Sequence, residues 1–148
     1  MTRSKPADVR FYFDADIRGL GMLLSRIRPD VTYPGDPGGE VHKRIRPPCV
    51  VKDVATPDDA WIPQVTEQGW LIITRDRHIR VRPREIAAVR DYGARLVALT
   101  AADATTIFNQ LEVVMCRWRD IVNCLDRAGP FIYTATRSTF EPVSLTPQ

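Results

Sequence analysis

Two short apolar runs in this chain end directly in aspartates, and these aspartates are the residues best placed to do chemistry. Residues 9–13 lead into Asp14 and Asp16, and residues 70–73 lead towards Asp76. In an open parallel sheet, ligands bind just outside the carboxyl ends of the strands, so acids from distant parts of the chain can converge there. Converging carboxylates repel one another unless a cation lies between them, and hard divalent ions prefer oxygen ligands. The pattern predicts a Mg²⁺ or Mn²⁺ site.

The acids after the two runs differ in how strongly their position indicates a metal role. Asp14 follows aromatic and apolar residues, where a charge without a partner would be desolvated at high cost. Asp76 repeats that arrangement, and Thr74 beside it can hydrogen-bond and orient a carboxylate. Asp16 stands at the start of a predicted helix, so it could bind the metal, cap the helix, or do both. We therefore expect Asp14 and Asp76 at the centre of the site, with Asp16 as a further ligand.

A second pair of acids, Asp58 and Asp59, falls in the first turn of another predicted helix, where the helix dipole favours anions whatever their function. Asp59 is three residues after Thr56, the spacing of a capping box, which gives it a structural explanation. Asp58 has no such explanation and is the better candidate ligand. Asp36, in a loop rich in proline and glycine, could reach the site as an auxiliary acid but is equally natural as a turn residue.

The elements that must position these acids alternate between strand and helix. Alternation of this kind predicts an α/β fold, a three-layer α/β/α sandwich around a mainly parallel sheet. A nearly continuous apolar run at 94–99 is typical of a strand covered on both faces. The expected strands are residues 8–13, 31–33, 49–51, 70–73, 94–99 and 131–136, with a short edge segment near Val143; the expected helices are 17–27, 56–68, 83–92 and a longest one from about 103 to 128.

The predicted long helix rests on apolar residues that recur every three or four positions from Ile107 to Leu125, which we interpret as core. Residues 34–39, Pro-Gly-Asp-Pro-Gly-Gly, predict an irregular loop. At 148 residues the chain is expected to form one domain, 1–148, with a core at about 9–136 and a tail at 137–148.

The order of these motifs resembles the PIN-like nucleases, the superfamily of the VapC-type toxins of bacterial toxin–antitoxin modules. The resemblance is carried by Asp14-Ala15-Asp16 after a strand, by Asp58 before a helix, and by Thr74-Arg75-Asp76 after a later strand, with Asp76 18 positions after Asp58. The segments 33–36 and 69–76 are similar to a PIN-like subfamily grouped with these toxins. The likeness covers roughly residues 9 to 136.

The resemblance implies a metal-dependent endoribonuclease with Asp14, Asp58 and Asp76 as its acidic core and Mg²⁺ or Mn²⁺ as cofactor. It also implies RNA as substrate, a cognate antitoxin as partner, and a homodimer. One departure stands out, because many relatives carry a further acid two positions after the Thr-x-Asp aspartate, where this chain has His78. His78 could touch a phosphate or be a solvated side chain, and Asp16 or Asp36 could supply the missing charge.

Basic residues form two groups, although the net charge is only +3. The first group crowds around Asp76 and consists of Arg75, Arg77, Arg80, Arg82 and Arg84. The second flanks the glycine-rich loop and consists of His42, Lys43, Arg44, Arg46 and Lys52. Any single arginine could be a solvated surface charge, but two groups beside a metal site are better explained by phosphate contacts along a nucleic-acid backbone.

Other chemistries find less support. No phosphate-binding glycine motif and no Ser-His-Asp grouping is present, and a catalytic pair would need both histidines, His42 and His78, to meet by chance. A haloacid-dehalogenase-like phosphohydrolase also uses Asp-x-Asp after its first strand, but Ile17-Arg18 follows where that family expects Gly-Thr. A PIN-like module that binds RNA or protein without cleaving it remains a second alternative. Three cysteines without a C-x-x-C pair, and the lack of a signal or membrane segment, predict a cytoplasmic protein with reduced thiols and no membrane association.

Overall fold

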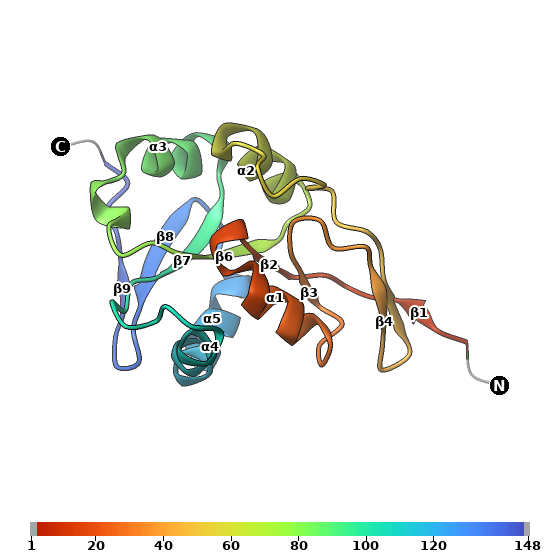
Figure 1. Ribbon diagram of the computed structural model, residues 1–148. Coiled ribbons are helices and arrows are strands. Elements are labelled where there is room, and N and C mark those ends of the chain that lie inside the picture. Colours follow the sequence, from red (N-terminus) through yellow and green to blue (C-terminus); the bar gives the residue numbers. More distant parts are fainter. Residues whose placement is uncertain (1–2, 147–148) are drawn as a thin grey trace.

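A parallel sheet forms the centre of the computed structural model, which describes residues 3–146 (Figure 1). Within these residues the sheet has six strands in the order β3-β2-β6-β7-β8-β9, and all neighbours run parallel except β8 and β9. The strands are β2 (Phe11–Phe13), β3 (Val31–Thr32), β6 (Leu71–Arg75), β7 (Arg95–Leu99), β8 (Phe131–Ala135) and β9 (Phe140–Pro142).

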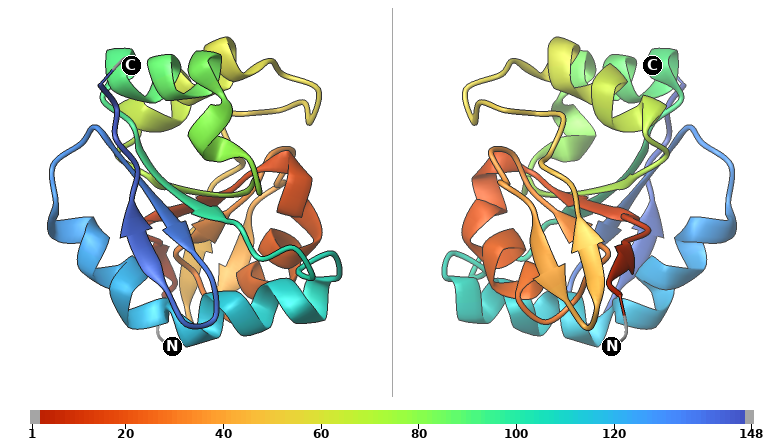
Figure 2. Two further views of the ribbon diagram at one scale, coloured as in Figure 1. Left: turned by 90° about the vertical axis from the view of Figure 1, so that its left-hand side faces the viewer. Right: turned by 90° about the vertical axis from the view of Figure 1, so that its right-hand side faces the viewer.

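Helices cover both faces of this sheet, so the predicted α/β sandwich with a mainly parallel sheet is confirmed (Figures 1 and 2). One face carries α2 (Asp58–Glu67) and α3 (Pro83–Tyr92). The other face carries α1 (Arg18–Ser25), α4 (Ile107–Cys116) and α5 (Trp118–Asn123). Short 3₁₀ turns join these elements: η1 (Ala15–Ile17), η2 (Ile79–Val81) and η3 (Cys124–Asp126).

The two-residue period of the strands divides the core into two halves. Phe11 and Phe13 of β2 pack with α1, α4 and α5, whereas Tyr12 between them packs with the indole rings of Trp61 and Trp70. Because successive side chains point to opposite faces of a sheet, this alternation also fixes the direction in which the next residue, Asp14, can point. The α2–α3 face of the sheet is thus the face shared by Tyr12 and the acids that follow it.

A second, smaller sheet was not predicted. It has the order β1-β5-β4, with β1 (Lys5–Pro6), β4 (Gly39–Val41) and β5 (Arg44–Arg46). Strands β4 and β5 form a hairpin whose turn residues, His42 and Lys43, have φ values of 50° and 60°. Turns of that kind match the twist of the flanking strands but normally use Asn or Gly, so the usual hairpin signal was missing from the sequence.

Two other predicted elements are wrong. Residues 49–51 are not a strand. The amide of Cys49 donates to the carbonyl of Asp36, and the carbonyl of Val51 accepts from the amide of Gly35, so these backbone groups bond to the loop after β3 and not to a neighbouring strand. The long helix is interrupted at Arg117, whose φ of −105° lies outside the helical range, and it begins only at Ile107, capped by the Thr106 hydroxyl. Its apolar period is largely core as expected, although Ile107 itself is 46% exposed.

Candidate active site

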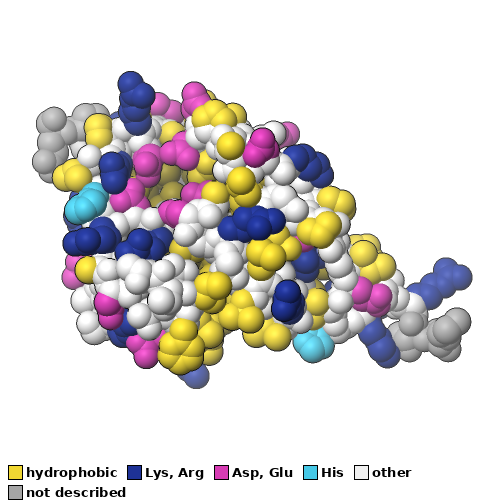
Figure 3. Space-filling view, in the orientation of Figure 1, with side chains coloured by type: hydrophobic (Ala, Val, Ile, Leu, Met, Phe, Trp, Pro, Cys, Tyr) yellow, Lys and Arg dark blue, Asp and Glu magenta, His cyan; other side chains and the backbone are white. Residues whose placement is uncertain are grey.

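A cavity of about 160 Å³ opens between the sheet and helices α2 and α3, at the carboxyl ends of β2 and β6. Apolar side chains from α2, α3 and β7 form its floor, and acidic side chains line its rim. In Figure 3, acidic side chains surround a hollow on the upper left of the visible face, with basic side chains beside it. Five carboxylates line the cavity: Asp14, Asp16, Asp58, Asp76 and Glu85.

The hydroxyl of Thr74 links the two acids that follow β2. Its Oγ1 lies 2.9 Å from Oδ2 of Asp16 and 3.3 Å from Oδ2 of Asp14. A hydroxyl has one proton to donate, so it cannot satisfy both carboxylates at once. Asp14 is further held by the amide of Ala15, 2.6 Å from its Oδ1, and Asp16 by the amide of Arg75 at 3.2 Å. Strand β6 therefore positions both acids through Thr74, whereas the sequence suggested that this threonine would orient the neighbouring Asp76.

Asp76 enters the cavity directly after β6. Its own amide donates to the carbonyl of Leu99 on the neighbouring strand, and its Oδ1 accepts from the amide of His78 at 2.8 Å. That bond closes a turn that leaves the His78 side chain exposed. Nε of Arg82 lies 3.4 Å from the second carboxylate oxygen, so Asp76 has one basic neighbour on the solvent side.

Asp58 and Asp59 are neighbours in the first turn of α2, but their side chains have different surroundings. Oδ1 of Asp58 accepts a 2.9 Å hydrogen bond from the indole of Trp61 and the residue lines the cavity, whereas Asp59 is exposed and does not. The expected capping box is absent, because Pro57 is the N-cap and the Thr56 hydroxyl donates instead to the carbonyl of Asp53. The reason given for preferring Asp58 was therefore wrong, yet it is Asp58 that meets the other acids.

Glu85 is the cavity residue that the sequence did not single out. It lies in the first turn of α3, where an acid is ordinarily explained by the helix dipole. The sequence does place Glu85 four residues before Val89, and residues four apart share a helix face. Because Val89 is fully buried, this spacing could have indicated that Glu85 faces the sheet and not the solvent.

The carboxylates of the cavity repel one another. Burial, with the charge of Asp16 added to it, raises the pKa of Asp14 to about 7. Burial together with the charges of Asp58 and Asp76 raises the pKa of Glu85 to about 7. The pKa of Tyr12, beneath them, is raised mainly by burial and then by Asp14. A cation would relieve this repulsion.

The donor set fits a hard divalent cation in its chemistry, because it consists of carboxylate oxygens without thiolate or imidazole. Among residues 3–146, no three His, Cys, Asp or Glu side chains are drawn together closely enough to hold an ion as they stand. Asp14, Asp16, Asp58, Asp76 and Glu85, which line the cavity, are the residues that would hold such an ion.

Asp36 does not join the cavity. Its carboxylate is fully buried elsewhere and pairs with Arg46, whose Nε lies 2.5 Å from Oδ2. It also accepts from the hydroxyl of Thr32 and the amide of Gly38. Both members of this ion pair hold the β4–β5 hairpin onto the loop after β3, so neither is free for a ligand or a phosphate.

The second basic group is dispersed in the structure. His42, Lys43 and Arg44 are exposed on the β4–β5 hairpin, which extends away from α2 and α3 (Figure 1). The hairpin lies at the opposite end of the molecule from α3, whereas Arg46 is buried. These residues therefore do not flank the acidic cavity as the sequence suggested.

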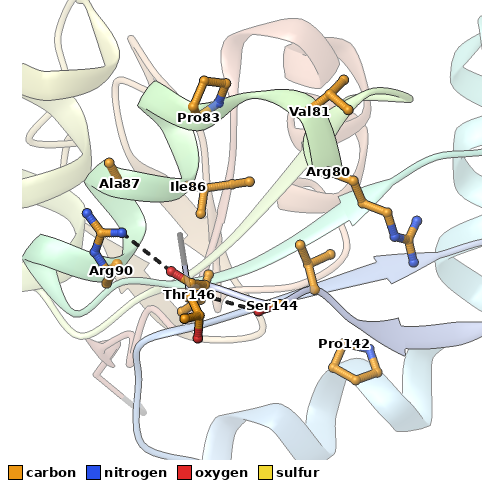
Figure 4. Close-up of a pocket in the computed structure, with 11 residues that line it drawn as sticks. Arg80, Val81, Pro83, Ile86, Ala87, Arg90, Pro142, Ser144 and Thr146 are labelled. Atoms are coloured by element: carbon orange, nitrogen blue, oxygen red, sulfur yellow. Dashed lines mark hydrogen bonds between the residues drawn. The ribbon is translucent and has the colours of Figure 1, made fainter. Parts of the chain in front are cut away.

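The first basic group remains beside the cavity, but its members differ. Arg77 and Arg84 are exposed and form no ion pair within the described part of the chain. Arg80 instead turns towards β8 and β9, 3.1 Å from Thr134 Oγ1 and 3.3 Å from Glu141 Oε2. Figure 4 shows it at the edge of a separate groove of about 640 Å³ between α3 and residues 142–146.

Comparisons with known proteins agree with this fold. Residues 41–101 match the sequence profile of the PIN-like domain, a stretch that contains Asp58, Asp76 and Glu85. A protein of Mycobacterium tuberculosis (strain ATCC 25618 / H37Rv) named "Putative ribonuclease VapC45" is 36% identical over 81 residues, which are 52% of this chain and 55% of that protein. The match thus spans about half the length of that relative. No solved structure matches the chain significantly. Together with the parallel sheet, these matches confirm the predicted resemblance to the PIN-like, VapC-type proteins.

Proposed function

We propose that this protein is a metal-dependent endoribonuclease that hydrolyses RNA phosphodiester bonds. The observation that carries the proposal is the cavity at the ends of β2 and β6, where five carboxylates from four separate segments meet beside an arginine-rich turn. The likeness to a protein named a ribonuclease supports RNA as the substrate. The charges alone would suit single-stranded DNA equally well.

In this proposal Asp14, Asp58 and Asp76 hold Mg²⁺ or Mn²⁺, with Asp16 as a further ligand. A bound divalent ion lowers the pKa of a ligated water and neutralises phosphoryl oxygens. The chain's own contribution is positional: Thr74 orients Asp14 and Asp16, and Trp61 fixes Asp58 through its indole N–H. The apolar floor, which includes Val89 and Leu96, keeps these charges partly out of water.

Arginines at the rim would bind the RNA backbone. Arg77 and Arg84 have the exposed, unpaired guanidinium groups that this needs among the residues described. The guanidinium of Arg82 lies beside Asp76, whereas that of Arg75 bonds to the carbonyl of Ala102. Phosphate contacts position a strand without reading its sequence. Arg80 is the weakest member of the set because its guanidinium is bonded to β8 and β9.

The partners proposed are a cognate antitoxin and a second copy of the chain. The antitoxin is supported by the name of the relative, since VapC proteins are the toxins of toxin–antitoxin modules. A homodimer is supported by large apolar side chains left exposed just after α1 and on α4, namely Ile27, Phe108 and Met115. None of the helices described has the length and apolar character needed to cross a membrane. We place the protein in the cytoplasm.

The proposal is tested by digesting labelled structured and unstructured RNAs with the purified protein, with and without Mn²⁺. We expect endonucleolytic fragments that depend on Mn²⁺, disappear in EDTA, and are absent for Asp14→Asn. Asp59→Asn is the matched control, because Asp59 is an exposed aspartate next to the site that does not line the cavity.

Three other results would contradict the proposal. Undiminished cleavage in EDTA would exclude a metal nuclease. Release of phosphate from small esters without RNA cleavage would favour a phosphohydrolase. RNA binding with no cleavage under any metal would leave a PIN-like binding module.

A further inference from the structure

Glu85 brings a carboxylate into the cavity from an element that supplies none of the other acids. It comes from the first turn of α3, whereas Asp14 and Asp16 follow β2, Asp58 begins α2, and Asp76 follows β6. Its nearest acidic neighbours in the cavity are Asp58 and Asp76, whose charges both act on it. Helix α3 packs beside α2, so the two helices present Asp58 and Glu85 to the same space (Figure 1).

The helix dipole favours an acid in this turn, but a capping role does not explain Glu85. A glutamate at the third position of a helix can accept a hydrogen bond from the amide of the N-cap residue. Here that residue is Arg82, and its amide already donates to the carbonyl of Ile79. Within residues 3–146, Glu85 forms no ion pair with a lysine or an arginine. A partly buried carboxylate that faces two others and forms no ion pair is stabilised by a bound cation.

The turn that follows Asp76 leads the chain to α3 without placing another acid in the cavity. His78, two residues after Asp76, has an exposed side chain. The turn closed by the His78 amide and the 3₁₀ turn η2 then carry the chain back over the cavity, so that the next acid in sequence, Glu85, points into it.

We propose that Glu85 is a ligand of the divalent cation together with Asp58 and Asp76. This inference rests on the proposed function. Glutamate has one more rotatable bond than aspartate, so its carboxylate can move further towards an ion entering the cavity. Helix α3 would then contribute a ligand to the site, and the bound cation would connect α3 to α2 and to the end of β6.

The test measures Mn²⁺ binding to the full-length protein by isothermal titration calorimetry at pH 8, without RNA. The variants are Glu85→Gln, which keeps the shape and removes the charge, and Glu85→Asp, which keeps the charge and shortens the reach. Glu67→Gln is the matched control, since Glu67 is an exposed glutamate at the end of α2 that does not line the cavity. Asp76→Asn reports on the proposed site itself. Melting curves without metal check that every variant is folded.

We expect Glu85→Gln to weaken Mn²⁺ binding by roughly 10-fold or more, Glu85→Asp to be intermediate, and Glu67→Gln to bind as the wild type does. RNA cleavage at a fixed low Mn²⁺ concentration should fall in the same order and recover in part as Mn²⁺ is raised. Wild-type affinity in Glu85→Gln, with binding lost in Asp76→Asn, would overturn the role of Glu85 and leave the nuclease proposal standing. Absence of Mn²⁺ binding to the wild type would overturn both.

Discussion

Adjacent aspartates at the start of α2 differ in their surroundings. Both are exposed, but Asp58 lines the cavity and accepts a hydrogen bond from the indole of Trp61, whereas Asp59 does not line the cavity. Both share the stabilising effect of the helix dipole, which is worth about 0.3–1 kcal/mol for an exposed acid. Only Asp58 can therefore combine that effect with a chemical role.

Substitution of each aspartate by asparagine distinguishes the roles of the two residues. Asp58→Asn should lower RNA cleavage by orders of magnitude while keeping the hydrogen bond from Trp61, because an amide oxygen still accepts it. Asp59→Asn should leave cleavage within about twofold and cost at most about 1 kcal/mol of stability, the loss of a dipole interaction. Initial rates at saturating Mn²⁺ and thermal melts provide the measurement. Equal losses of activity in the two variants would contradict the assignment.

The raised pKa of Asp14 predicts how stability depends on pH in the protein without metal. Because burial and Asp16 raise the pKa of this carboxyl from 3.8 to about 7, the folded state binds more protons than the unfolded state between these values. Stability contributed by the neutral form is therefore lost as pH rises through about 7. Asp14→Asn removes this loss and keeps the bond from the Ala15 amide.

We expect the melting temperature of Asp14→Asn to exceed that of the wild type by an amount that grows from pH 5 to pH 8. The gap should reach a few degrees, since one to two kcal/mol shifts the melting temperature of a protein this size by roughly that much. Mg²⁺ should close the gap by stabilising only the wild type. A difference that stays constant between pH 5 and pH 8 would show that Asp14 does not titrate as proposed.

At the scale of elements, the connection from β6 through η2 to α3 does most to shape the site. It delivers Asp76 at one end and Glu85 at the other, and its arginines point in different directions between them. Arg80 is turned to β8 and β9, while Arg77 and Arg84 face solvent beside the cavity. The best pair for testing RNA binding is therefore Arg77 and Arg84.

Replacement of both with glutamine, on an Asp14→Asn background that prevents cleavage, should weaken binding to RNAs of different sequence by a similar factor. The slope of log affinity against log salt should become shallower by about 1.4, because each phosphate contact to a single strand contributes roughly 0.7. Fluorescence anisotropy at several salt concentrations measures this. Arg26→Gln with Arg119→Gln is the control, since both are exposed on the opposite face of the sheet. An unchanged slope would make Arg77 and Arg84 ordinary surface charges.

At the scale of the whole molecule, a buried ion pair joins the two sheets. Arg46 of β5 bonds to Asp36 and also reaches the carbonyl of Ser25 at the end of α1, and its side chain is 5% exposed. Asp36 adds the bond from Thr32 of β3. The hairpin is thereby attached to the main sheet and to α1 through charged groups that water does not reach.

Asp36→Ala would leave the Arg46 charge buried without a partner, which costs about 3–5 kcal/mol. We expect a large drop in melting temperature, and nearly normal RNA cleavage when the assay is run at a temperature where the variant is still folded. Asp126→Ala, at an exposed aspartate of η3, should change neither property. Lost activity with an unchanged melting temperature would instead support the auxiliary metal role first considered for Asp36.

Local sequence patterns determined a large part of this protein. Apolar runs that end in Asp14 and Asp76, and the helix start at Asp58, fix which residues stand at strand and helix ends, because strand and helix formation depend on near neighbours. The parallel order of the sheet then brings the strand ends to one edge. These relations were sufficient to predict the α/β sandwich, the acids of the cavity except Glu85, and the resemblance to the PIN-like proteins.

Tertiary structure alone decided which charged residues meet. Glu85 joins the acids because of how α3 packs against α2, and Arg46 leaves the surface because a hairpin without the usual turn residues folds onto Asp36. Arg80 bonds to β8 and β9, whereas Arg77, three positions earlier, is exposed to solvent. The reason is physical: a charged side chain adopts the position where its desolvation is best compensated, and that compensation comes from partners distant in the chain.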